Sequence, residues 1–408
     1  MIKKDRMLIK FSLYGFLKNL RFFDPFIILI FRAGGLSFLQ IGFLYSIRDV
    51  STNVLEIPTG VYADARGRRH SLVLAFSAYI LSFVIFYFFN SFLILAAGMI
   101  FFACGEAFRS GTHKALIMEY LDLNQMSKLK VAYYGRTRSA SQLGSALNAL
   151  IAAGLIFFTG DYKLMFLIST IPYTLDLLNV ATYPRELDGN LIEREKGAVA
   201  ARFRATFREF KGMFTDKQVM RAILNSSSFN AVFKSSKDYL QPILAAFALS
   251  VPLWMQMEDM RREAVIIGLV YFGLYLLTSY ASRRAGRFSG RFKDLAQAVN
   301  LSFLVGAVLL LFAGAASWYR AGLLSITAFI AIYLLYNLRK PVNVGLIGDK
   351  LATRVMASGL SVESQFTTLI MAAVAPLLGF LADAYNVGVG LSAVGAGMFV
   401  VFFLVRVE

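Results

Sequence analysis

The sequence predicts an all-α membrane protein with twelve membrane-spanning helices, from its composition, its long apolar windows and the distribution of its basic residues. Of the 408 residues, 57% are hydrophobic and 16% are charged, whereas a soluble domain has about 45–50% apolar and about 25% charged residues. Charge-free apolar windows of about 18 or more residues can cross a bilayer. Such windows lie at 71–105, 139–160, 239–257, 264–282, 295–319, 364–382 and 384–405.

The expected spans follow the chain in order once polar interruptions are allowed. They are 9–31, 38–62, 71–89, 92–117, 133–158, 162–182, 219–249, 263–282, 294–314, 321–347, 358–382 and 386–405. The window 71–105 is too long for one span, so we expect a hairpin at Asn90-Ser91. We expect Pro25 and Pro242 to break the first and seventh spans, because proline lacks a backbone donor and collides with the preceding turn.

The basic residues set the expected orientation. Twelve spans put both termini on one side of the membrane, and that side carries 28 Lys and Arg residues against 5 on the other. Basic residues collect in cytoplasmic loops, so both termini are expected in the cytoplasm, with the protein in the plasma (inner) membrane. The same bias explains the net charge of +17 without nucleic acid as a partner.

A long polar loop divides the chain into six spans plus six. The expected parts are an N-terminal bundle at 1–183, a cytoplasmic linker at 184–218 and a C-terminal bundle at 219–408. The two bundles repeat: "FRSGTHKALIMEYL" at 108–121 aligns without gaps to "LRKPVNVGLIGDKL" at 338–351. In the linker, "RFRATFREFKGMF" repeats phenylalanines at helical spacing between basic residues, which predicts an amphipathic surface helix. It either couples the two halves or is an inert tether.

The loop after the second span reads "GVYADARGRRHSL", at 60–72. It resembles the signature G-x-x-x-D-R-x-G-R-R of the major facilitator superfamily, with Ala65 where the pattern has arginine. The resemblance covers the full chain and implies two six-helix bundles and secondary transport by alternating access. It also implies a cytoplasmic gate, in which Asp64 faces the start of the eleventh span and Arg66 or Arg68 pairs with Glu119. The gate residues are Gly60, Asp64, Arg66, Gly67, Arg68, Arg69 and Glu119. The alternative is a basic turn that only follows the charge bias.

Charged residues inside spans are functional candidates, because each costs about 2.5–3.5 kcal/mol to insert. Most lie on the first, fourth, seventh and tenth spans, which line the central cavity in the family that the chain resembles. At 100° per residue, they form one polar stripe on each helix. The solute-binding candidates are Tyr14, Lys18, Arg21, Arg109, His113, Asn230, Lys234, Lys237, Gln241, Tyr336, Arg339 and Asn343.

On these four spans basic residues outnumber acidic ones, which favours an anionic or zwitterionic organic solute. A carboxylate in an apolar cavity can carry a proton for coupling. The candidates are Asp24 and Glu106, followed by Asp49, Glu56 and Asp238. Alternatively, the charges form pairs that only reduce the cost of desolvation. Those pairs would be Arg21 with Asp24, Glu106 with Arg109, and Lys234 or Lys237 with Asp238.

Other functions remain as alternatives. No HExxH, GxSxG or phosphate-binding loop occurs, so we expect neither an enzyme nor a cofactor. The main rival is a proton-coupled multidrug exporter, given the many phenylalanines. A metal or metal-chelate transporter is a further alternative, because "WMQMEDM" at 254–260 gathers thioethers that suit Cu(I). A membrane sensor or lipid-flipping protein would lack solute transport. The expected partners are a small solute, protons and the bilayer, with the chain as a monomer.

Overall fold

The computed structural model describes residues 5–126, 129–188, 204, 217–252, 254–350 and 356–407, and these contain helices and connections but no strand. In this part of the chain, nine helices are long and apolar enough to cross a membrane. They are Arg68–Phe88, Phe92–Leu123, Tyr133–Thr159, Leu164–Ala181, Asp259–Ser289, Leu295–Trp318, Gly322–Gly348, Gly359–Ala384 and Val387–Val405. The predicted all-α membrane fold is confirmed.

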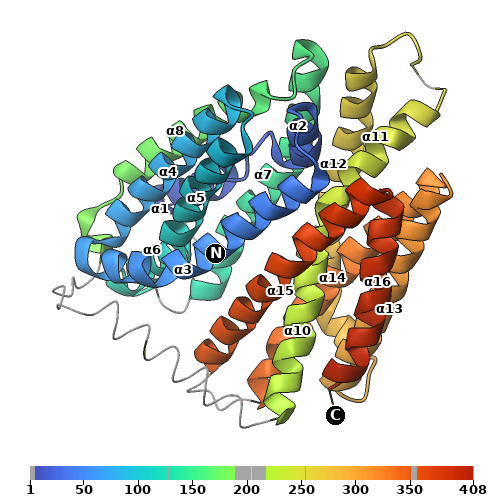
Figure 1. Ribbon diagram of the computed structural model, residues 1–408. Coiled ribbons are helices and arrows are strands. Elements are labelled where there is room, and N and C mark those ends of the chain that lie inside the picture. The colour runs from blue at the N-terminus through green and yellow to red at the C-terminus, as the bar shows by residue number, and fades with distance from the viewer. Residues whose placement is uncertain are drawn as a thin grey trace. The chain divides into compact units, whose positions relative to one another are not determined.

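The chain divides into two compact units (Figure 1), of which the first comprises Met1–Phe26 and Ser51–Phe203. Its helices are α1 (Arg6–Leu17), the second part of α3 (Phe38–Arg66), α4 (Arg68–Phe88), α5 (Phe92–Arg109), α6 (Thr112–Leu123), α7 (Lys130–Thr159) and α8 (Leu164–Ala181). Within this unit, α1 packs against α7 and α8, and α4 packs against α5 and α8.

The second unit comprises Ile27–Val50 and Arg204–Glu408. Its helices are α2 (Ile27–Ala33), the first part of α3, α10 (Lys217–Ser236), α11 (Leu240–Ser250), α12 (Asp259–Ser289), α13 (Leu295–Trp318), α14 (Gly322–Lys350), α15 (Met356–Ala384) and α16 (Val387–Val405). The pairs α13–α16, α13–α14 and α10–α15 form most of its interior.

Residues 27–50 group with the second unit, although the sequence suggests the first. Asp383 at the end of α15 accepts hydrogen bonds from the backbone N–H groups of Phe38 and Leu39 at 2.9 and 2.8 Å. A carboxylate is well placed there, because the start of α3 carries free donors and a partial positive charge. Gln241 accepts a further bond from the Ile28 N–H at 2.8 Å. The predicted amphipathic helix of the linker lies outside the described residues, except for Arg204.

Four predicted spans are either broken or too charged to count as single long apolar helices in the structure. The first is broken as expected: α1 ends at Leu17, and a 3₁₀ turn at Asp24–Phe26 holds Pro25. Side chains satisfy the carbonyls that this break releases, as irregular backbone at membrane depth requires. The Tyr173 hydroxyl donates to the Lys18 carbonyl at 2.9 Å, and the Asn148 amide donates to the Arg21 carbonyl at 3.0 Å.

The seventh span breaks at a different place from the one that its proline suggests. A 3₁₀ turn at Lys237–Tyr239 separates α10 from α11, and Pro242 is the third residue of α11. In the first helical turn a proline removes no hydrogen bond, which explains why it is tolerated there. The second span, α3, is continuous but carries too many charges to qualify as an apolar span.

The fourth predicted span contains a break that the sequence analysis missed. α5 ends at Arg109, Gly111 adopts a left-handed conformation with φ of 71°, and α6 begins at Thr112. Glycine takes this conformation without steric cost. Glu106 and His113, which we placed on one helical face, therefore lie on two helices joined by a tight turn.

Candidate functional site

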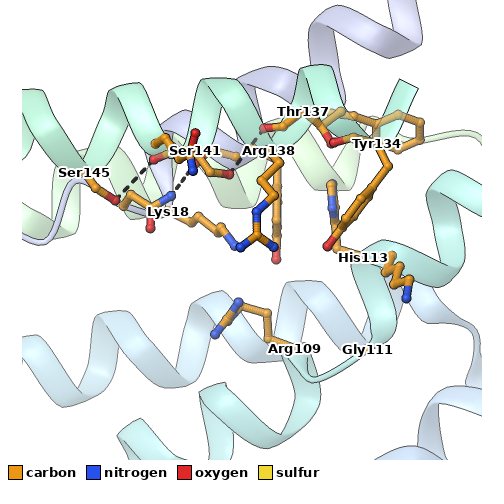
Figure 2. A pocket seen from close by; sticks show the side chains of 15 residues that line it. Lys18, Arg109, Gly111, His113, Tyr134, Thr137, Arg138, Ser141 and Ser145 are labelled. Carbon is orange, nitrogen blue, oxygen red and sulfur yellow. Dashed lines mark hydrogen bonds between the residues drawn. The ribbon is translucent and has the colours of Figure 1, made fainter. Parts of the chain in front are cut away.

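A cavity of about 410 Å³ lies inside the first unit, between α1, α7 and the turn that joins α5 to α6 (Figure 2). The charged residues that line it are Lys18, Arg109, Lys114 and Arg138, and no carboxylate occurs among its described lining residues. Figure 2 shows the guanidinium groups of Arg109 and Arg138 entering this space from opposite walls. The cavity therefore concentrates positive charge.

Two glycines bring α1 and α7 close enough to form this wall. A Cβ atom at Gly144 would lie 2.5 Å from the Phe16 carbonyl oxygen, and one at Gly15 would lie 2.6 Å from the Ser141 hydroxyl oxygen. Small residues permit such close contact between membrane helices. Their packing places Lys18, directly after α1, next to the hydroxyl-bearing face of α7.

An aromatic stack forms another part of the cavity wall. The rings of Tyr14 and His113 are parallel within 6°, with their centroids 3.5 Å apart. The ring of Phe11 meets His113 edge-on at 5.4 Å, and the Tyr183 hydroxyl lies 3.5 Å from His113 Nε2. The stack connects the wall to α8 through Tyr183, which follows that helix.

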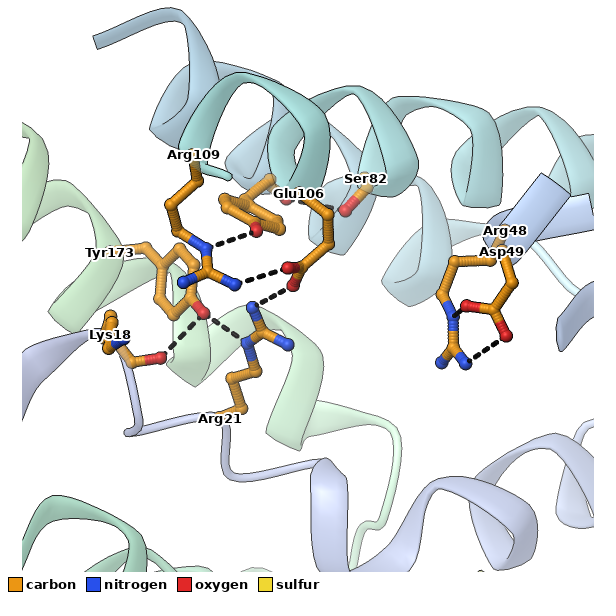
Figure 3. Close-up of polar contacts among 9 residues, drawn as sticks. Lys18, Arg21, Arg48, Asp49, Ser82, Glu106, Arg109 and Tyr173 are labelled. Carbon is orange, nitrogen blue, oxygen red and sulfur yellow. Dashed lines mark hydrogen bonds and ion pairs between the residues drawn. The ribbon is translucent and has the colours of Figure 1, made fainter. Parts of the chain in front are cut away.

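Beside the cavity, one carboxylate joins two arginines (Figure 3). Glu106 Oε1 accepts a hydrogen bond from Arg21 Nη2 at 2.7 Å, and Glu106 Oε2 pairs with Arg109 Nη2. Arg21 also donates to the Tyr173 hydroxyl, and Arg109 Nε donates to the Tyr79 hydroxyl at 3.0 Å. The cluster has a net charge of +1.

Comparison with known proteins identifies the family. A model of the Major Facilitator Superfamily matches residues 13–362. The chain belongs to the Major Facilitator Superfamily. A mutant of the nucleoside transporter NupG has a similar structure, with a TM-score of 0.78 and 11% identity, over 98% of this chain and 100% of that one. A POT family transporter in complex with 5-aminolevulinic acid has a TM-score of 0.75 and 13% identity, over 98% and 95% of the chains.

A curated relative agrees with this membership. The uncharacterized MFS-type transporter YxaM of Bacillus subtilis (strain 168) is 32% identical over 90 residues, which cover 22% of this chain and 23% of YxaM. The match thus spans less than a quarter of that relative. The protein is a multi-pass membrane transporter of the major facilitator type.

The superfamily signature forms the sharp turn between α3 and α4. Gly67 alone separates the two helices and has φ of 99°. Arg68 Nη1 pairs with Glu119 Oε2 of α6 at 3.0 Å. Asp188 Oδ1 accepts a hydrogen bond from the Arg69 N–H at 2.7 Å and thereby caps α4. The sequence analysis missed Asp188, which lies more than a hundred residues away.

The other carboxylates considered for proton coupling have nearby polar partners. Asp49 pairs with Arg48, its neighbour in sequence, at 2.9 Å. Glu56 accepts from the Ser110 hydroxyl at 2.9 Å, and Lys237 donates to Asp238 at 2.7 Å. Asp24 lies in the 3₁₀ turn of the first broken span. Their roles in coupling stay predictions.

In the second unit of the transporter, the predicted solute-binding residues differ in burial and in their contacts. Asn230 donates to Glu363 Oε1 of α15 at 2.6 Å, and Gln241 is fully buried against Ile28. Tyr336 stacks on Phe233 with ring centroids 3.9 Å apart. Lys234 is exposed, and Asn343 is buried. Glu363 itself had not been selected from the sequence.

Arg339 makes its contacts inside the second unit. Its side chain is 1% exposed and donates to the Val299 carbonyl, to Ser302 at 2.7 Å and to Asn225. Its guanidinium also lies 4.4 Å from the centre of the Phe229 ring. These contacts join α14 to α10 and α13. Its Nη donors are directed at protein acceptors, while its Nε is buried without a partner among the described residues, and a role of Arg339 in solute binding stays a prediction.

The cavity includes residues that the sequence analysis did not select. They are Phe11, Gly15, Asn19, Gly111, Lys114, Tyr134, Thr137, Arg138, Ser141, Gln142 and Ser145. A signal was present, since Arg138, Ser141 and Ser145 recur at helical spacing within the predicted fifth span. Among the described residues, no group of three or more His, Cys, Asp or Glu could hold a metal ion.

Proposed function

We propose that this transporter moves a small organic anion or zwitterion across the membrane by proton-coupled alternating access. The observation that carries the proposal is the cavity of about 410 Å³ that four basic side chains line without a described carboxylate. This volume lies within the range for small-molecule sites, about 300–1,000 Å³. An anionic group bound there would offset the repulsion among these cations.

The donors in the cavity suit a carboxylate or phosphate group. Guanidinium groups offer paired donors in a fixed plane, which matches the two oxygens of a carboxylate. Arg109 and Arg138 supply two such groups on opposite walls, and Lys18 adds an ammonium. Ser141, Gln142 and Ser145 can orient the rest of the solute by hydrogen bonds.

The transport cycle would use the elements that the family resemblance implied. Two six-helix bundles, at 1–183 and 219–408, would rock about the site, with both termini in the cytoplasm and the monomer held in the plasma membrane. The signature turn would close the cytoplasmic side, supported by the ion pair between Arg68 and Glu119. Protons would bind at carboxylates near the cavity, with Glu106 the candidate that directly contacts a lining residue.

The charge of the cavity disfavours the main rival. A multidrug exporter for lipophilic cations would place positive solutes among four cations. The repulsion between like charges makes such binding unfavourable. The similar structures include nucleoside and peptide transporters. Peptides are zwitterions, whereas nucleosides are uncharged, so both classes belong in a solute screen.

The proposal is tested by solute flux into proteoliposomes, with and without an imposed pH gradient. The solutes are organic acids, amino acids, short peptides, nucleosides, nucleoside phosphates and lipophilic cations. We expect uptake of one anionic or zwitterionic class, stimulated by the gradient. Uptake of lipophilic cations alone would overturn the solute class, and gradient-independent flux would overturn the proton coupling.

A further inference from the structure

Asp176 on α8 is a fully buried carboxyl group, with a relative exposure of 0%. Its Oδ1 accepts one hydrogen bond, from the Asn179 amide at 3.2 Å. Its Oδ2 is buried and has no hydrogen-bond partner, and no ion pair of Asp176 occurs in the part of the chain that the structure describes. An ionised carboxylate in such a place costs several kcal/mol, so a buried carboxyl group with this few partners is best accommodated with its proton.

The groups around Asp176 come from several elements. Lys18 and Tyr14 of the first broken span, Arg109 of α5 and Tyr183 after α8 are all close enough to act on it electrostatically. The cations favour loss of the proton, while burial and the lack of a partner favour its retention. The helices α4 and α7 also pack against α8. From α4, Tyr79 meets Tyr173 of α8 edge-on. From α7, Tyr133 lies near Tyr183 and hydrogen-bonds Asp5 at 3.1 Å.

Tyr14 connects this carboxyl group to the cavity. It lines the cavity, and its hydroxyl is another buried polar atom without a hydrogen-bond partner among the described residues. A buried water molecule needs two to four polar partners. The Tyr14 hydroxyl and Asp176 Oδ2 are two such unpartnered groups, and water that entered from the cavity beside Tyr14 would supply the hydrogen bonds that they lack.

We propose that Asp176, in place of Glu106, is the proton-binding residue of this transporter and that its carboxylate competes with the anionic solute for Lys18 and Arg109. When protonated, Asp176 is neutral and leaves both cations to the solute. When water reaches it, the carboxyl group transfers one proton to that water, the O–H electron pair stays on Oδ2, and the new carboxylate neutralises one cation. Proton binding thus favours solute binding, which makes the transporter a symporter. The inference rests on the proposed function and names its coupling residue.

The test uses infrared difference spectra of the purified full chain in lipid, at mildly acidic and at alkaline pH, without solute. Wild type should show the carbonyl band of a protonated carboxylic acid that disappears on alkalinisation. Asp176→Asn should lack that band. The matched control is Asp161→Asn, at the exposed start of the same helix, where Asp161 Oδ1 caps the Lys163 N–H at 2.7 Å. Its spectrum should equal that of wild type.

A second variant still tests the inference if Asp176→Asn fails to fold. Asp176→Glu retains the carboxyl group on a longer chain, so its band should shift in frequency. A band that stays unchanged in either variant overturns the inference. In proteoliposomes, Asp176→Asn should retain solute exchange but lose its stimulation by the pH gradient, and retained stimulation also overturns the inference. If wild type has the Asp176 band but shows no gradient-driven flux, the proton coupling of the proposed function fails while the protonated carboxyl group stands.

Discussion

At the scale of single residues, Glu106 holds together the charges beside the cavity. It bridges Arg21 and Arg109, and the three side chains are only 17–24% exposed. Removing one partner from such an ion-paired group leaves the other charges uncompensated, which costs about 3 kcal/mol. The carboxylate therefore matters for stability whether or not it carries a proton.

We predict that Glu106→Gln lowers the melting temperature of the detergent-solubilised transporter, measured by the fluorescence of a thiol- or tryptophan-based probe. The expected loss is about 3 kcal/mol, because two arginines lose their counter-charge. The matched control is Glu119→Gln, which removes the more exposed pair with Arg68 and should cost about 1 kcal/mol or less. Equal effects of the two variants would contradict the central place of Glu106.

Arg339 and Arg109 should respond differently to the same change. Arg339→Ala should lower the melting temperature strongly, because Asn225 and Ser302 lose a buried donor. Solute affinity of the surviving protein should stay unchanged. Arg109→Ala should instead raise the KM for uptake at least tenfold, since hydrogen bonds to charged groups contribute about 1.5–3 kcal/mol. A raised KM in Arg339→Ala would support the solute-binding role that the sequence suggested.

At the scale of elements, the turns between helices depend on backbone conformations that few residues adopt. Gly67 has a positive φ, and a Cβ atom there would lie 2.7 Å from Asp188 Cγ. Gly60, in the same signature, sits inside α3 with nothing within 4 Å of a Cβ atom. The backbone conformation and packing of the turn thus require glycine at position 67, whereas the packing around position 60 does not.

We predict opposite effects of alanine at these two positions. Gly67→Ala should cost about 1–2 kcal/mol from backbone strain alone, with a further cost from displacement of Asp188. Gly60→Ala should be neutral or stabilise by about 0.5–1 kcal/mol, as alanine does within a helix. Thermal unfolding of both variants under identical conditions measures this difference. A Gly67→Ala protein as stable as wild type would show that the turn tolerates another conformation.

The positions of the helices could be predicted from the sequence more accurately than the positions of the breaks within them. The first span was predicted to break at Pro25 and is broken, but α1 already ends at Leu17, and Pro25 lies in the 3₁₀ turn that precedes α2. The break at Gly111 was not predictable, because a single glycine is tolerated inside many helices and its φ is set by packing. The predicted break at Pro242 was wrong, because Pro242 lies in the first turn of α11, where a proline removes no helical hydrogen bond.

The site was predictable only in part, because periodicity reveals a helical face but not its neighbour. Tyr14, Lys18, Arg109 and His113 were selected from polar stripes, and all four line the cavity. The pairing of Arg21 with Glu106 depends on how two helices pack. Asp176 is the single charged residue of α8, on the buried face that it shares with Ser169 and Tyr173, and its missing hydrogen-bond partner is visible only in the structure.

At the scale of the whole molecule, the superfamily fold is shown by the helices and by the family match, while the solute class rests on charge. The chain has a net charge of +17, much of it explained by the bias of cytoplasmic loops. The cations of the cavity are different, because they converge on one pocket of a bundle, in which Lys18 and Arg109 are partly buried while Lys114 and Arg138 are exposed. An anion held by the partly buried pair gains attraction that salt screens less than at an open surface.

The central claim, that this cavity binds an anionic solute, is tested most directly by removing one of its cations. The measurement is the KM for uptake of the preferred solute and of its uncharged ester, in wild type, Arg138→Gln and Arg136→Gln. Arg138 lines the cavity and Arg136, two residues earlier on α7, does not. We predict that Arg138→Gln raises the KM for the acid about tenfold, leaves that for the ester unchanged, and that Arg136→Gln affects neither. Unchanged KM values for the acid in Arg138→Gln, or equal losses for acid and ester, would contradict the account.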